Sequence, residues 1–229
     1  MEWLILHTVL SPFVKGHVVP YHRRLFLVRP QVSSHIALLD AAGLAVIETI
    51  KGGIYPPGRR TQLQVAYCYL VIEQQFAIAH LLEAGMTGSA FALARPTFEA
   101  LAKGLWLYHC ATDEQLERHV AGKELDQVTK LTESILLSDL PKVITTSLHG
   151  IKAKYWKTLS SLTHVGHAQV RHWLNEAGVQ PSYPEPALHE LANFASFMAV
   201  VAGRELALRA SNPDGVARLS KMLPEFRLQ

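Results

Sequence analysis

The chain has 229 residues, of which 49% are hydrophobic and 18% are charged, and its formal net charge is +3. This length suffices for one domain that buries roughly 70% of its unfolded surface. The charged share lies below the usual value of about a quarter, which favours several fully buried helices and a homo-oligomer interface. No basic run is longer than a pair such as Arg23-Arg24, so the charge pattern does not indicate a nucleic-acid surface.

The cysteines and the lengths of the apolar runs indicate in which cellular compartment the protein is expected. Cys68 and Cys110 each lie inside an apolar stretch, where a packed thiol is more common than a disulfide. The first residues are apolar but lack the positive charge that opens a signal peptide. Apolar runs such as 194–203 are too short or too interrupted to cross a bilayer. We therefore expect a cytoplasmic protein that makes no membrane contact.

The N-terminal segment differs from the rest of the chain. Its helix-breaking residues recur every few positions, at Pro12, Gly16, Pro20 and Pro30. No long helix fits there, so residues 1–32 are predicted to be an irregular arm outside a helical domain of residues 33–229. Residues 25–28 suit a short strand or a packed arm that reaches a second subunit. A non-native extension from an upstream start codon is the alternative.

From residue 33 onward the hydrophobic pattern has the period of helices, with capping residues and Gly or Pro at the boundaries. Ser33 or Ser34 suits the first cap, Thr112 with Gln115 resembles a capping box, and Pro186 suits a first helical turn. Predicted helices cover residues 33–50, 60–83, 86–110, 112–121, 123–137, 141–148, 151–176 and 187–210, with a short one after Asn212-Pro213. Outside the arm no useful window alternates with a period of two. The sequence therefore predicts an all-α, single-domain bundle of about five long helices plus short ones, with an irregular N-terminal arm.

Charged residues interrupt the apolar helix predicted for residues 86–110. They lie four residues apart on one side of it, at Arg95, Glu99 and Lys103. Pro96 cannot donate a hydrogen bond to the carbonyl of Ala92, so the helix is expected to kink there. A charged stripe beside a free carbonyl on a core helix predicts a polar pocket in the bundle.

A second polar stripe is predicted on the helix after Gly150. Its members are spaced 4, 4, 3 and 4 residues apart, at Trp156, Ser160, His164, His167 and Arg171. Two interpretations stay open. Either the histidines are solvated on a half-exposed face, or His164 and His167 turn into a pocket near Arg95 and Glu99.

Glu73 and the two glutamines after it add polar groups to an apolar helix and are candidates to complete a buried hydrogen-bond network. A buried pair of Arg95 and Glu99 has to be well hydrogen-bonded to offset its desolvation. Such a network can serve the specificity of the fold alone. That structural role is the strongest competitor of a functional pocket.

The chain has twelve histidines, which raises the question of a metal site. Di-metal sites in helical bundles use Glu-x-x-His pairs, and the sequence contains none. His164 and His167 could share an ion with Glu73 or Glu99, but one His-x-x-His is a weak signal. We therefore predict no metal and no cofactor. There is also no Gly-x-Ser-x-Gly and no Gly-rich phosphate loop.

Two short motifs carry a resemblance to a known family. One is Arg95-Pro96-x-x-Glu99, and the other is Tyr155-Trp156-Lys157-x-Leu159-Ser160-x-x-x-His164. Together they resemble a broad family of uncharacterised bacterial helical proteins, in which an Arg-x-x-x-Glu helix precedes a Leu-Ser-x-x-x-His helix. The resemblance spans about residues 33–210 and implies an all-helical bundle. It marks four matching positions, Arg95, Glu99, Ser160 and His164.

Looser relatives in this resemblance are proteins of phage-defence and abortive-infection systems, some of them similar to HEPN ribonucleases. The HEPN active site has an Arg, a polar residue and then a His after four to six intervening residues on one helix. Here the one spacing match runs from Arg29 to His35, with Pro30 at the polar position in a predicted loop. Ribonuclease activity is therefore not carried over, which leaves at most a similarity of fold.

Three functional hypotheses follow from these residues. The first is a dimeric, non-enzymatic bundle in a bacterial defence or regulatory setting that binds a small polar ligand through Arg95, Glu99 and His164. Further contacts would come from Glu73, Lys103, Ser160 and His167. The second is a hydrolase acting on a phosphodiester, in which Arg95 holds the anion, His164 is the general acid or base, and Glu99 orients it. The third is a metal-dependent enzyme that uses His164, His167 and a carboxylate.

Overall fold

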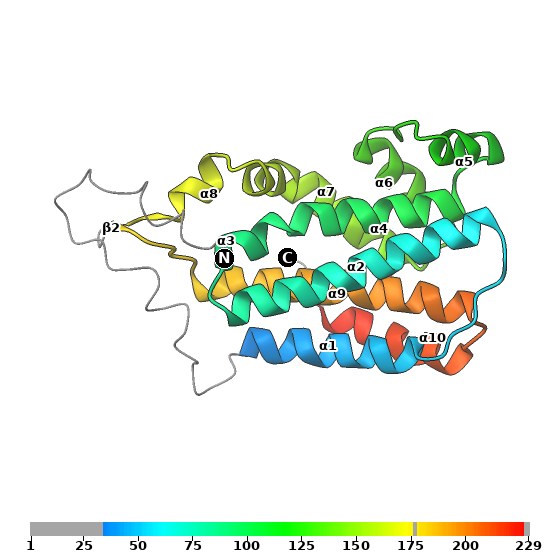
Figure 1. The fold of residues 1–229 in the computed structure, drawn as a ribbon, viewed down its shortest axis with the longest axis horizontal. Coiled ribbons are helices and arrows are strands. Elements are labelled where there is room, and N and C mark those ends of the chain that lie inside the picture. The colour runs from blue at the N-terminus through cyan, green and yellow to red at the C-terminus, as the bar shows by residue number, and fades with distance from the viewer. Residues whose placement is uncertain (1–33, 176–177, 227–229) are drawn as a thin grey trace, which may run out of the picture.

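A computed structural model describes residues 34–175 and 178–226 as a bundle of roughly parallel and antiparallel helices (Figure 1). The long helices are α1 (Ser34–Ile50), α2 (Arg59–Glu83), α4 (Ala94–His109), α7 (Lys142–Thr163) and α9 (Glu185–Arg209). The short ones are α3 (Thr87–Ala92), α5 (Asp113–Val120), α6 (Val128–Leu136), α8 (His167–Arg171) and α10 (Pro213–Met222), followed by a 3-10 turn, Leu223–Glu225. The all-α, single-domain prediction is confirmed. The predicted arm, residues 1–32, lies outside the described residues.

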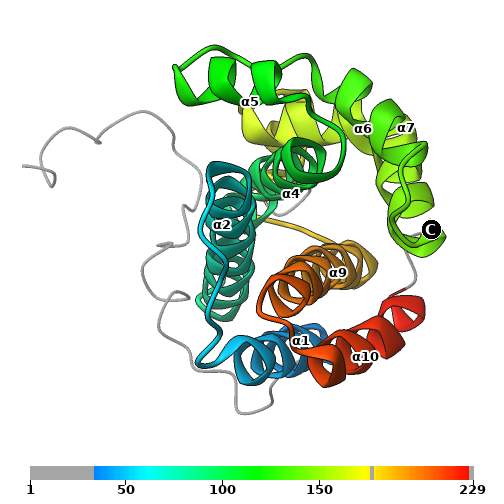
Figure 2. The same cartoon turned by 90° about the vertical axis from the view of Figure 1, so that its right-hand side faces the viewer.

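Helix α9 forms the centre of the core. It packs against α1, α2, α4 and α10, and Figure 2 shows it surrounded by these helices. Its stretch 194–203 is uncharged and entirely buried, because neighbours cover it on every side. A Cβ on Gly203 would lie 2.9 Å from Cγ1 of Val46, so this glycine allows α1 and α9 to approach closely.

Two helices, α2 and α9, are apolar and long enough to cross a membrane when judged by length and composition alone. This finding differs from the expectation that the apolar runs are too short or too interrupted to cross a bilayer. In the fold, 78% of the most apolar window of α9 is buried, against 39% for α2. Core helices of globular proteins have the same composition, so this finding is weak evidence for a membrane span.

The helix caps predicted at Thr112 and Asn212 are present. Oγ1 of Thr112 accepts from the backbone N of Gln115 at 3.2 Å, and the Gln115 side chain accepts from the backbone N of Thr112 at 2.8 Å. Oδ1 of Asn212 accepts from the backbone N of Gly215 at 2.9 Å and caps α10. Pro186 lies in the first turn of α9, as predicted. Local capping chemistry therefore sets these boundaries.

The helix predicted for residues 86–110 is broken rather than kinked. α3 ends at Ala92 and α4 starts at Ala94, so Pro96 lies in the first turn of α4, where its missing N–H leaves no bond unmade. The free carbonyl of Ala92 accepts instead from Oγ1 of Thr163, at 3.1 Å. The proline thus creates an acceptor on α3 that the end of α7 uses.

The predicted helix break at Gly150 and the predicted helix end at residue 176 are wrong. α7 continues through Gly150 and stops at Thr163, whereas separate helices 141–148 and 151–176 were expected. A glycine inside a helix costs about 1 kcal/mol, and the burial of Leu148 and Ile151 on either side offsets it. The segment after α7 forms α8 and a minimal hairpin of β1 (Leu174–Asn175) and β2 (Gly178–Val179).

The helix predicted for residues 123–137 also starts late, at Val128. Residues 123–127 are mostly exposed, so they have no apolar face to dock against the bundle. Isolated helical turns are marginal without such packing. Gly122, which precedes this segment, has a φ of 80°.

Candidate functional site

The guanidinium of Arg95 lies between two partners, one on its own helix and one at the end of α7. Its Nε donates to Oε1 of Glu99 at 2.7 Å, one turn along α4. Its Nη1 lies 2.8 Å from Nε2 of His164, which immediately follows α7. The expected contact between the two motif helices is therefore confirmed. Arg95 forms the contact with His164 itself, and Glu99 takes part only through its bond with Arg95.

This contact assigns a tautomer to the imidazole of His164. A guanidinium carries only donors, so Nε2 of His164 accepts and the ring proton lies on Nδ1. No other described residue forms a hydrogen bond with this ring, and the side chain is exposed. His164 in this arrangement therefore has one donor, Nδ1–H, that no described residue uses and that is available to a ligand.

The indole of Trp156 is a platform for two cations. Cζ of Arg95 lies 4.6 Å from the centre of the ring, and Nζ of Lys152 lies 4.4 Å from it. Phe98, fully buried on α4, packs against the same indole with 6.1 Å between ring centres. Below, "the Arg95 cluster" means Arg95, Glu99, Lys152, Trp156 and His164.

The ammonium of Lys152 is partly withdrawn from water. Burial is the main cause that lowers its pKa, the carboxylate of Glu133 opposes this effect, and the nearby Arg95 adds a smaller lowering effect. The net direction is downward. An anion placed beside Lys152 and Arg95 would favour the charged ammonium and oppose the effect of burial.

Two further predicted residues border the cluster. Nζ of Lys103 lies 3.9 Å from Oε2 of Glu99, so the charged stripe on α4 exists as the spacing predicted. Oγ of Ser160 donates to the carbonyl of Trp156 within α7, at 2.8 Å. That bond occupies the Ser160 proton, although the oxygen keeps acceptor capacity.

The second predicted stripe does not continue past His164. Because α7 ends at Thr163, His167 and Arg171 belong to α8, and the expected single stripe is wrong beyond that point. His167 is exposed and forms no hydrogen bond or ion pair with the Arg95 cluster among the described residues. The same holds for Glu73, which is exposed on α2.

The metal hypothesis needs several ligands in one place. Among the residues that the structure describes, no three His, Cys, Asp or Glu side chains lie close enough together to hold a metal ion. Nε2 of His164 already accepts from Arg95, and Glu99 is bonded to the same guanidinium. The imidazole of His164 and the carboxylate of Glu99 are thus both bonded to the guanidinium of Arg95.

Sequence reasoning missed Lys152 as a member of the cluster. It lies one helical turn before Trp156 on the same face of α7, so extending the stripe by four residues toward the N-terminus would have found it. Because a break was expected at Gly150, Lys152 lay at the start of a predicted helix and was not assigned to the polar stripe. Trp156 was named in the stripe, but its use by two cations depends on the packing of α4 against α7.

A second polar network, which the sequence did not indicate, lies in the core around Glu205 on α9. This carboxylate is completely buried and accepts from Nε2 of Gln64 at 3.0 Å, from Nε2 of His109 at 2.8 Å and from Nη1 of Arg204 at 2.7 Å. Burial alone would raise the pKa of Glu205. The hydrogen bond and charge of His109 and the charges of Arg204 and Arg209 outweigh burial and lower it.

The two cysteines are free thiols, as expected. Burial raises the pKa of Cys68, and the Glu205 carboxylate adds to this effect, while Arg209 opposes it. Burial also raises the pKa of Cys110. Thiols with raised pKa values are poor nucleophiles, so neither is a candidate catalytic group.

Comparison with known proteins gives one match. A family model described as "Family of unknown function (DUF6988)" matches residues 68–229, which covers α4, α7 and the Arg95 cluster and leaves out α1. No curated protein and no solved structure matches the chain. The site geometry therefore carries the functional argument.

Proposed function

Because the chain belongs to the DUF6988 family of unknown function, we propose its function from this site: a binding module for a small anion of the phosphate-monoester type. The ligand would lie against the Arg95 cluster, at the junction of α4 and α7. The observation that carries the proposal is the Arg95–His164 contact, which holds a guanidinium against the same indole that the ammonium of Lys152 contacts.

The charges at this junction favour an anion. Arg95, Lys103 and Lys152 supply three positive charges, against two carboxylates, Glu99 and Glu133. Nε and Nη1 of Arg95 are engaged, and its other terminal nitrogen has no partner among the described residues. A guanidinium donor, an ammonium and an imidazole N–H together match the several acceptor oxygens of a phosphate.

The hydrogen bonds favour binding over the hydrolase hypothesis. A general base needs a free ring nitrogen oriented by a carboxylate, but Nε2 of His164 accepts from Arg95 and Glu99 is bonded to Arg95 instead. The hydroxyl of Ser160, the candidate from the sequence motif, donates to its own helix. Hydrolysis would require all three groups to exchange partners.

The proposal is tested by titrating the full chain with phenyl phosphate in a calorimeter at low salt. We expect one site that weakens as salt rises, because the contact is ionic. Arg95→Met and Lys152→Met should each reduce affinity about tenfold, the loss of one charge-assisted contact. Lys157→Met, which removes an exposed lysine from the same helix, is the matched control and should bind as the unmodified chain does. Equal affinity in all four proteins would contradict the proposal.

We further propose that the module works as a cytoplasmic homodimer in a bacterial defence or regulatory setting. The setting is supported by the resemblance of the two motifs. The dimer is supported by large apolar side chains exposed on the adjoining helices α1 and α2, namely Leu44, Ile47, Tyr69 and Leu70. Light scattering after size-exclusion chromatography should give twice the chain mass. A double change of Leu44 and Leu70 to Glu should give the chain mass itself, and a monomeric unmodified protein would contradict the dimer.

A further inference from the structure

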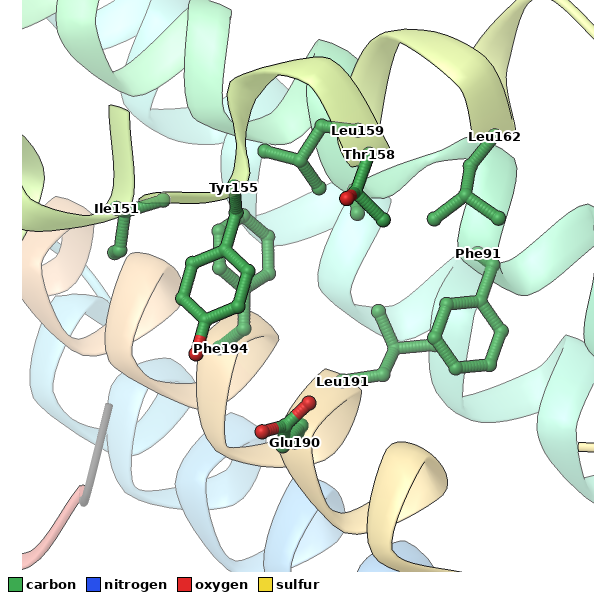
Figure 3. A pocket seen from close by; sticks show the side chains of 10 residues that line it. Phe91, Ile151, Tyr155, Thr158, Leu159, Leu162, Glu190, Leu191 and Phe194 are labelled. Carbon is green, nitrogen blue, oxygen red and sulfur yellow. The ribbon is translucent and has the colours of Figure 1, made fainter. Parts of the chain in front are cut away.

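A separate pocket opens on the other side of α7, between that helix and α9. Its cavity measures about 110 Å³ and is also lined by Phe91 and Ala94 from the junction of α3 and α4. Figure 3 shows side chains entering this space from α7 on one side and from α9 on the other. None of the residues of the Arg95 cluster lines it.

The walls of this pocket are apolar and held in place. Leu159 and Leu191 are buried on the two facing helices. The ring of Phe91 stacks on Tyr183 with 4.8 Å between centres, and Tyr183 stacks in turn on His172 at 4.4 Å. A cavity of roughly 150 Å³ with similar apolar walls stays dry and takes up benzene. The space here therefore fits a compact hydrocarbon group of similar or slightly smaller size.

One charged group lines the pocket, the carboxylate of Glu190 on α9. Its side chain is exposed, and no other described residue forms an ion pair or hydrogen bond with it. Figure 3 shows it on the α9 side of the space, with Tyr155 and Thr158 on the α7 side. A free carboxylate beside the aromatic rings of Phe91, Tyr155 and Phe194 is complementary to a cation.

We propose that this pocket binds a small primary amine with a compact apolar body. The hydrocarbon fills the space between α7 and α9, and the ammonium lies at the mouth on Glu190. An anionic ligand would meet the Glu190 carboxylate, and a neutral one would leave that charge unused. The ring of Tyr155 already holds the ammonium of Lys154 5.0 Å from its centre, so Glu190 rather than Tyr155 supplies the main contact with the ligand cation.

The probes that test this are cyclohexylamine, cyclohexanol and cyclohexanecarboxylate, which share one ring and differ in charge. In calorimetric titrations of the full chain we expect the amine to bind at one site. The alcohol should bind about tenfold more weakly, because it lacks the charge-assisted contact. The carboxylate should not bind. Equal affinity for the amine and the alcohol, or no binding of the amine, would overturn the proposal.

Two exposed positions allow variants that leave the core intact. Glu190→Gln should reduce amine affinity about tenfold and leave the alcohol unchanged, whereas Thr158→Trp should fill the mouth and abolish both. Glu114→Gln on α5 is the matched control and should bind the amine like the unmodified chain. Arg95→Met should also leave amine binding unchanged, which separates this site from the anion site. Unreduced amine affinity in Glu190→Gln would contradict the inference.

Discussion

Nη1 of Arg95 and Nε2 of His164 lie 2.8 Å apart, so one hydrogen bond joins the first turn of α4 to the end of α7. The residue before His164 makes a second link, from Thr163 to the carbonyl of Ala92 at 3.1 Å. Both links attach the end of α7 to the break between α3 and α4. The break between α3 and α4 leaves the carbonyl of Ala92 and the guanidinium of Arg95 at the same place. The motif that contains Pro96 and the motif that ends at His164 meet there for this reason.

Replacing Glu99 with alanine tests how deeply the cluster is buried. A fully buried Arg95 left without its partner would cost about 3–5 kcal/mol of unfolding free energy. The structure leaves 22% of the Arg95 side chain and 24% of Glu99 exposed, so water can solvate the remaining charge. We expect a loss of about 1–2 kcal/mol in urea unfolding. Lys103→Ala should cost less, because its ammonium is 3.9 Å from the carboxylate. A loss above about 3 kcal/mol would mean that the pair is buried in solution.

Replacing Gly150 with alanine should stabilise the protein. This glycine is exposed in the interior of α7, and an added Cβ would meet nothing within 4 Å. Alanine is favoured over glycine inside a helix by about 1 kcal/mol. Gly122→Ala is the control of opposite sign, because Gly122 has a φ of 80° and a side chain there is strained. Thermal unfolding should show a rise for the first variant and a fall for the second. A fall for Gly150→Ala would indicate that α7 is interrupted at this residue.

The buried carboxylate of Glu205 should make stability depend on pH. Its pKa is lower in the folded chain than the unfolded value of about 4.3, so folding favours the ionised form. Its contribution is therefore complete above about pH 4.3 and is lost as the pH falls from there toward the folded pKa. The difference in unfolding free energy between the unmodified chain and Glu205→Gln should be constant at neutral pH and shrink below about pH 4. A difference that does not change down to pH 3 would show that Glu205 is not ionised in the fold.

Removing Glu205 altogether should be costly. Glu205→Ala leaves Arg204 and His109 without their buried acceptor, and we expect a loss of about 3–5 kcal/mol in urea unfolding. Glu225→Ala, which removes a glutamate near the end of the described chain, should change stability little, because Glu225 is exposed. Similar losses in the two variants would contradict the buried network.

Most of the fold could be predicted from the sequence, because caps and apolar periodicity are local signals. Thr112 and Asn212 cap the helices that they were expected to cap. The helix break predicted at Gly150 was wrong. It relied on the low helix propensity of one glycine and did not include the packing of α7 against α4 and α6. Helix propensity is a weak signal when buried neighbours oppose it.

The Arg95 cluster could be predicted in part. The spacing of Arg95 and Glu99 places them on one face, and the contact of Arg95 with His164 was correctly expected. The Glu205 network could not be predicted, since Gln64, His109 and Glu205 come from three helices far apart in the chain. Each of them looks like an isolated polar residue until the helices are packed together.

The measurement that tests the anion site most directly is the pKa of Lys152 by NMR of its labelled ε-carbon, with and without phenyl phosphate. In the free protein, burial lowers this pKa, and the opposing effect of the Glu133 carboxylate does not reverse the direction. A phosphate bound beside Lys152 favours the charged ammonium, so the account predicts that the pKa rises when the ligand is added. The ε-carbon signal of exposed Lys157 on the same helix is the control and should not respond to the ligand. A Lys152 pKa that stays the same at ligand concentrations that saturate the calorimetric site would contradict binding at the Arg95 cluster.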